Sequence, residues 1–196
     1  MTCVPPLPYL SLFTMSTYTI MHLTIGVGTA LAAYASHSRY ATWGGNNATG
    51  GNLLQQYEPT IACVCLFTLL YYVILFHQSA TGFMQKSILG QKAKKDGEKP
   101  PSMSSIKYGK GGGLPILRAN RSVANLIEQT IPFLLGIWLH CVFVDPLAAA
   151  RLGWLWIAVR GFYPFVFGKG PLLFAVTLPN YVCIFLMFKP FMGTVF

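Results

Sequence analysis

The chain has 196 residues, of which 54% are hydrophobic and 14% aromatic, and its mean hydropathy of +0.51 lies outside the usual range of a soluble domain. The net charge of +9 could indicate a nucleic-acid-binding protein, but nine of the fourteen basic residues lie between Lys86 and Arg121, beside an apolar segment. Basic residues that flank membrane spans on the inner side explain this distribution better, so we exclude nucleic acid and expect contact with a lipid bilayer.

Five apolar segments are long enough to cross the hydrocarbon core, which takes about 20 residues of helix. They cover residues 17–34, 60–80, 122–144, 147–167 and 172–188. The short connections "DP" and "GKGP" join the last three, which we therefore expect to be antiparallel neighbours. The sequence predicts an all-α, multi-pass integral membrane protein.

Two long connections suggest how the chain is organised. Residues 1–57 form an N-terminal extension with an extra transmembrane helix and a Gly/Asn-rich loop, and residues 58–196 form a membrane domain of four helices. Within that domain, residues 86–117 are expected to be a basic Gly/Lys-rich loop. With five spans, this loop and the N-terminus lie on one side of the membrane, which the positive charge predicts to face the cytoplasm, stroma or matrix.

The cysteines and histidines give weaker signals. The cysteines are scattered, so neither a metal site nor a disulfide framework is expected. His22 and His140 lie within apolar helices, where imidazole could ligate the metal of a chlorophyll or a haem. We prefer the interpretation that both are structural histidines, hydrogen-bonded inside the bundle.

The stretch "RANRSVANLIEQTIPF", residues 118–133, carries a polar stripe at the start of the third apolar segment. At 100° per residue, six polar side chains fall within an arc of about 120°. These are Arg118, Arg121, Ser122, Asn125, Glu128 and Gln129. Exposing the glutamate alone to lipid would cost several kcal/mol, so the stripe must face a bundle, a subunit interface or a wet cavity.

Two interpretations of the stripe remain open. Glu128 could form a structural ion pair with an arginine, either Arg121 on its own helix or Arg160 on another. Alternatively, the arginines could clamp an anionic or zwitterionic ligand at the membrane surface, for which the planar, bidentate guanidinium is well suited.

The pattern Arg-x-x-Arg-x-x-x-Asn-x-x-Glu, followed by an apolar run with an early proline, resembles the signature of the membrane-associated proteins in eicosanoid and glutathione metabolism, the MAPEG superfamily. The resemblance covers residues 58–190 and implies a four-helix membrane fold, usually a homotrimer, whose enzymes bind glutathione between subunits. It also implies glutathione-binding roles for the matching residues. These are Arg118, Arg121, Asn125 and Glu128, together with Arg160 and Tyr163 in "WIAVRGFYPF".

The sequence departs from this family where the chemistry takes place. The enzymes use an arginine near the start of the last helix to hold the glutathione sulfur as the thiolate, the nucleophilic form. This chain reads "FGKGPLLFAVTLPNY" there, without an arginine after Arg160. Lys169 is the cation that could substitute as a catalytic residue, although it is a mobile point charge. The family's second tyrosine position is occupied by Phe167.

Two functional hypotheses follow from different classes. The first is a non-catalytic accessory or structural subunit of a larger membrane complex, in a plastid or mitochondrion rather than the endoplasmic reticulum, with other membrane subunits as partners. The second is a glutathione transferase or peroxidase that acts on lipophilic electrophiles. Glutathione or a lipid is the ligand we consider for either hypothesis.

Overall fold

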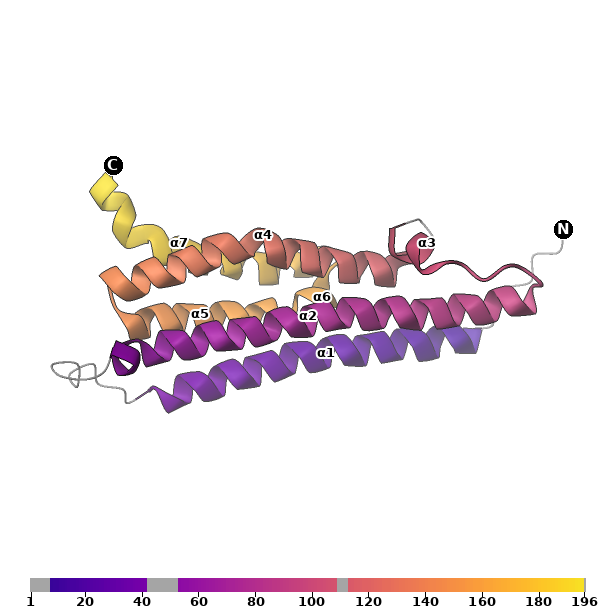
Figure 1. The fold of residues 1–196 in the computed structure, drawn as a ribbon, viewed down its shortest axis with the longest axis horizontal. Coiled ribbons are helices and arrows are strands. Elements are labelled where there is room, and N and C mark those ends of the chain that lie inside the picture. Colours follow the sequence, from indigo (N-terminus) through magenta and orange to yellow (C-terminus); the bar gives the residue numbers. More distant parts are fainter. Residues whose placement is uncertain (1–7, 42–52, 109–112, 196) are drawn as a thin grey trace.

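The structure is a computed structural model that describes residues 8–41, 53–108 and 113–195. Within these ranges the chain is helical and contains no strand, which confirms the predicted fold class. The helices are α1 (Pro8–Arg39), α2 (Leu53–Lys95), α3 (Met103–Tyr108), α4 (Gly113–Phe143), α5 (Pro146–Arg160), α6 (Tyr163–Val166) and α7 (Leu172–Val195). The long helices lie side by side along the long axis of the molecule, with α1 at one edge against α2 (Figure 1).

Four of these helices are long and apolar enough to cross a membrane within the part of the chain described. They cover Thr17–Arg39, Leu54–Lys95, Gly113–Phe143 and Leu172–Gly193. The expected span 147–167 is not one continuous helix. It consists of α5, whose 15 residues reach about 22 Å, followed by the single turn of α6. The break between them follows Arg160, so α5 ends at a charged side chain inside the bundle.

The expected loop at residues 86–117 is partly wrong, because much of it is helical. Helix α2 continues past Ala80 to Lys95 and has 43 residues, a length of about 65 Å. Lysine and glutamine are the most frequent good helix formers of this extension, which also contains methionine, leucine and alanine. The helix ends just before Gly97, whose φ of 71° is one that glycine adopts without strain. Helix α3 then adds one buried contact through Ile106.

The N-terminal extension packs its helix α1 against α5, and also contacts α2 and α6. Gly26 allows this approach, because a Cβ built on it would lie 2.5 Å from the ring of Phe162. Gly28 has nothing within 4 Å of such a Cβ. Of these two glycines, therefore, Gly26 lies in the contact between α1 and the rest of the bundle, and Gly28 does not. The extension covers one face of the four-helix domain.

An aromatic cluster joins the helices of the domain in the core. Phe133 on α4 lies between Phe67 on α2 and Trp156 on α5, with ring centroids 4.8 and 4.4 Å away. Gly153 on α5 sits beside this cluster, where a Cβ would lie 2.8 Å from Cδ1 of Ile137. These contacts fix α2, α4 and α5 relative to one another and so position the polar face of α4.

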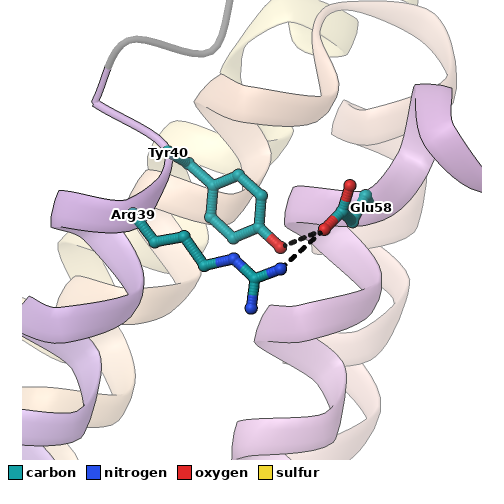
Figure 2. A network of polar contacts seen from close by, with 3 residues as sticks. All are labelled: Arg39, Tyr40 and Glu58. Carbon is teal, nitrogen blue, oxygen red and sulfur yellow. Dashed lines mark hydrogen bonds and ion pairs between the residues drawn. The ribbon is translucent and has the colours of Figure 1, made fainter.

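A polar network joins the C-terminal end of α1 to the start of α2 (Figure 2). The Tyr40 hydroxyl donates a hydrogen bond to Glu58 Oε1 at 2.9 Å, and Arg39 Nη2 approaches the same oxygen at 3.3 Å. Tyr40 is buried and its ring stacks on Trp154, with centroids 5.6 Å apart. Burial raises the pKa of the Tyr40 hydroxyl, and the neighbouring carboxylate raises it further.

We expect the two contacts to Glu58 to differ in strength. Arg39 is 72% exposed, and exposed ion pairs contribute about 0.2–1 kcal/mol, so Arg39→Ala should change the free energy of unfolding by less than about 1 kcal/mol. Tyr40→Phe removes a partly buried hydrogen bond to a charged group and should cost about 1.5 kcal/mol. Denaturation in detergent micelles compares the two variants. A larger loss for Arg39→Ala would contradict this ranking.

Candidate functional site

The polar stripe of α4 divides between the inside and the outside of the protomer. Ser122 and Gln129 are buried, at 1% and 3% exposure. Asn125 is half-buried, while Arg121 and Glu128 are exposed. Arg121 and Glu128 therefore lie on the surface of the single chain, at the edge of the packed face of α4.

Arg160 is the most deeply buried charged group of the predicted site. It is 0% exposed, and its Nε, Nη1 and Nη2 have no hydrogen-bond partner. Its Cζ lies 4.5 Å from the ring centroid of Tyr163 and 5.7 Å from that of Trp156. The guanidinium is thus held between two aromatic faces, an arrangement that stabilises a cation and leaves its donors free for an acceptor.

A first cluster forms around this guanidinium. Arg160 interacts electrostatically with Tyr163, Tyr181 and Glu128, and Tyr163 also interacts with Arg121. The structure therefore brings together Arg121 and Glu128 on α4, Arg160 at the end of α5, and Tyr163 at the start of α6. Four of the six predicted binding residues belong to this group, and Asn125 lies on the same helix one turn from Arg121 and Glu128.

The expected ion pair of Glu128 does not form in the protomer. Among the residues that the structure describes, the ion pair present is Arg39–Glu58. Glu128 extends from the surface of α4, whereas Arg160 is enclosed between rings, so the two interact without contact. The sequence pattern placed both residues near the same end of the bundle but did not indicate which of them points inward.

Arg118 and Lys169 belong to a different, second cluster. A Cβ built on Gly168 would lie 3.7 Å from Nε and Nη2 of Arg118, so this guanidinium packs on the turn between α6 and α7. Lys169 in the same turn places its Nζ 3.2 Å from the centroid of Phe165. His22 interacts electrostatically with both cations. The lysine considered as a substitute for the catalytic arginine thus lies beside Arg118 and α1.

The two histidines considered as tetrapyrrole ligands differ in their surroundings. His140 is buried, and its Nδ1 donates a hydrogen bond to the Met187 carbonyl at 3.1 Å, as expected of a structural histidine. His22 is also buried, but its neighbour is a second imidazole, that of His77, with ring centroids 4.7 Å apart. Four of the five cysteines lie in described side-chain positions, and these are free thiols. No cluster of metal ligands occurs in the described part of the chain.

Sequence reasoning missed three polar residues, of which Asn180 and His77 are buried and Tyr181 is exposed. Asn180 on α7 is 0% exposed, and both atoms of its amide lack a hydrogen-bond partner. Its neighbour Tyr181 interacts with Arg160. His77 on α2 was also missed. The available signal was a polar residue inside an otherwise apolar helix, since "LPNYV" and "LFHQS" interrupt two of the most hydrophobic segments.

The model of the MAPEG family matches residues 60–189 of this chain. The chain belongs to the MAPEG family. The match begins within α2 and ends within α7, so it covers the four-helix domain and leaves α1 outside. No curated protein and no solved structure is detectably similar to the chain. It is a multi-pass membrane protein of this family with an additional N-terminal helix.

Chemically, the first cluster can hold an anion or a zwitterion. Arg160 and Arg121 supply guanidinium donors, Tyr163 supplies a hydroxyl, and Glu128 supplies an acceptor for an ammonium group. A peptide with carboxylates and an amine matches this set of groups. Among the described residues the cluster has no cation besides the two arginines, so it has no additional charge to offer a reacting sulfur.

Proposed function

We propose that the chain is a non-catalytic accessory or structural subunit of a larger membrane complex. The observation that carries this proposal is a stripe of side chains along α4 that are exposed in the protomer. Their spacings of four, seven, three and four residues place them along one side of the helix. The members of the stripe are Leu117, Arg121, Glu128, Ile131 and Leu135. A stripe that combines two charged side chains with three large apolar ones suits neither lipid, where each charge would cost several kcal/mol, nor water.

Such a stripe is suited to a protein partner. A second copy of the chain or a different membrane subunit could supply the acceptors and donors that Arg121 and Glu128 lack, and the family suggests a membrane oligomer such as a homotrimer. The long basic extension of α2, up to Lys95, offers further surface for neighbouring subunits. We propose an organellar membrane of a plastid or mitochondrion as the setting, since subunits with such extensions are frequent in energy-converting complexes.

The distribution of cations supports the absence of catalysis. After Arg160 the chain has two basic residues, Lys169 and Lys189. Lys169 belongs to the cluster around Arg118, and Lys189 lies near the other end of α7, next to Pro190. Neither is on the first turns of α7, where the family's enzymes carry the arginine that stabilises the thiolate.

A glutathione transferase or peroxidase is the second candidate, and the Arg160–Tyr163 arrangement favours it. The buried guanidinium keeps all its donors without a partner and has Tyr163 and Glu128 close by. These groups match the positions through which the family's enzymes bind glutathione. Binding of glutathione without its activation is compatible with the first candidate as well.

Purification of the tagged chain in a mild detergent tests the subunit proposal. We expect other membrane subunits to copurify with the wild type, and we expect Glu128→Gln to reduce their yield, because the partner would lose the carboxylate that it binds. Glu58→Gln is the matched control, since Glu58 is already bonded to Arg39 and Tyr40 within the chain. A wild type that purifies alone, as a monomer or homotrimer, would contradict the accessory-subunit role.

A further inference from the structure

Four segments meet on the side of the bundle that carries the second cluster. His22 of α1 faces His77 of α2, with ring centroids 4.7 Å apart. The next residue of α2, Gln78, donates a hydrogen bond to Asn120 of α4 at 2.9 Å. Two positions before Asn120, Arg118 packs on Gly168 of the α6–α7 turn. One level of the structure therefore combines α1, α2, α4 and this turn.

Buried polar atoms at this level lack partners. His77 is 2% exposed, and neither Nδ1 nor Nε2 has a hydrogen-bond partner. Thr81 lies one turn further along α2, is 0% exposed, and its hydroxyl is without a partner. The buried Nε of Arg118 is in the same state. A polar atom that is buried and unsatisfied destabilises the fold. His22 faces His77 and interacts with Arg118, so unsatisfied groups lie on both sides of His22 and indicate a missing ligand.

The charges at this level select the kind of ligand. His22 interacts with two cations, Arg118 and Lys169, and with no carboxylate. Partial burial lowers the pKa of Lys169, and the Arg118 charge lowers it further, so the two cations repel each other. A metal cation between the imidazoles would add to this repulsion. An anion would relieve it and would accept hydrogen bonds from the donors.

We propose that Arg118, Lys169, His77 and Thr81 form a binding site for a phosphate group, with His22 packed beside it. A phosphate offers several acceptor oxygens in different directions, which suits donors that come from α2, α4 and a turn. The site exists because α1 covers His77 of α2, so it depends on the N-terminal extension and not on the four-helix domain alone. It is separate from the cluster of Arg160 and Tyr163.

The phosphate can belong to a membrane lipid or to a soluble molecule, and two probes distinguish these sources. Native mass spectrometry of the chain from nanodiscs of phosphatidylcholine with a minor fraction of phosphatidic acid measures retained lipid. Thermal unfolding in detergent with inorganic phosphate, compared with chloride at equal ionic strength, measures a soluble anion. We expect retention of phosphatidic acid by the wild type, and a decrease of about tenfold in that retention in Arg118→Gln, since it loses a charge-assisted hydrogen bond.

Matched variants distinguish a specific phosphate site from general attraction of anionic lipid to basic residues. Lys169→Gln and Thr81→Val should also lower retention, whereas Lys95→Gln, a lysine at the far end of α2, should leave it unchanged. Stabilisation by inorganic phosphate without retention of lipid would support the phosphate site and assign it a soluble ligand. A wild type that responds to neither probe would overturn the proposal. An equal loss in Lys95→Gln would do so as well.

Discussion

Purified protein should show little or no glutathione conjugation, even where glutathione binds. Arg121, Glu128, Arg160 and Tyr163 can contact the carboxylates and the amine of the peptide, so binding in the ground state does not require a catalyst. The chemical step also requires a stabilised sulfur anion. Removing one electrostatic stabiliser of a reacting anion lowers turnover by about 10²- to 10³-fold, and we expect a deficit of this size against an enzyme that has the arginine.

Two measurements check this expectation together. The ultraviolet absorbance of the thiolate at neutral pH reports whether bound glutathione is ionised, and turnover of an aromatic halide reports the reaction. Lys169→Ala is the informative variant, because Lys169 is the sole cation of the α6–α7 turn, and Lys95→Ala is its control. A thiolate signal whose turnover disappears in Lys169→Ala alone would establish the enzyme interpretation and contradict the expectation.

The position of Lys169 explains why we expect no rescue from this residue. Its Nζ lies over the ring of Phe165, and its electrostatic neighbour is Arg118. Tyr163 belongs to the expected glutathione site, and it interacts with Arg160, Arg121, Glu128 and Tyr181 instead. A lysine needs to leave an aromatic contact and move between clusters before it can reach a thiol bound at Tyr163.

Much of the fold could be predicted from the sequence, because hydrophobic segment length is set by the bilayer. The apolar runs, the short connections and the extra first helix all follow from composition along the chain. The extent of α2 did not, since polar residues such as lysine and glutamine continue a helix as readily as they form a loop, and Gly82 and Gly90 do not interrupt this one. Hydropathy also gives no sign that the segment 147–167 breaks after Arg160; the sign in the sequence is the pair of helix breakers Gly161 and Pro164.

The candidate site was predictable in its residues and less so in its grouping. A helical wheel places Arg118 and Arg121 on one polar arc, yet they belong to different clusters, because Arg118 packs on the turn at Gly168 whereas Arg121 interacts with Tyr163. That difference depends on the turn at Gly168 and on α1, which are distant in sequence. His77 was missed because a single histidine in an apolar run acquires meaning only when its partner, His22, is known to face it.

Gly161 should be the most sensitive position in the contact between α1 and the family domain. A Cβ at this residue would overlap Oγ1 of Thr29 and lie 2.9 Å from its Cβ. The backbone of Gly161 has φ −57° and ψ −25°, which any residue adopts, so Gly161→Ala tests space alone. Overpacking of this kind costs about 1–3 kcal/mol, and we expect the upper end because a β-branched side chain on a helix has little freedom to move.

The control for this substitution lies on α1, next to Thr29. Gly28 has nothing within 4 Å of an added methyl group, so Gly28→Ala should be neutral or slightly stabilising through helix propensity. Thr29→Ala in the Gly161→Ala background removes the overlapping oxygen and should recover part of the loss. Unfolding in detergent measures all three variants. Equal stability of Gly161→Ala and Gly28→Ala would mean that α1 does not pack on α5, and the histidine pair that α1 completes would then lose its basis too.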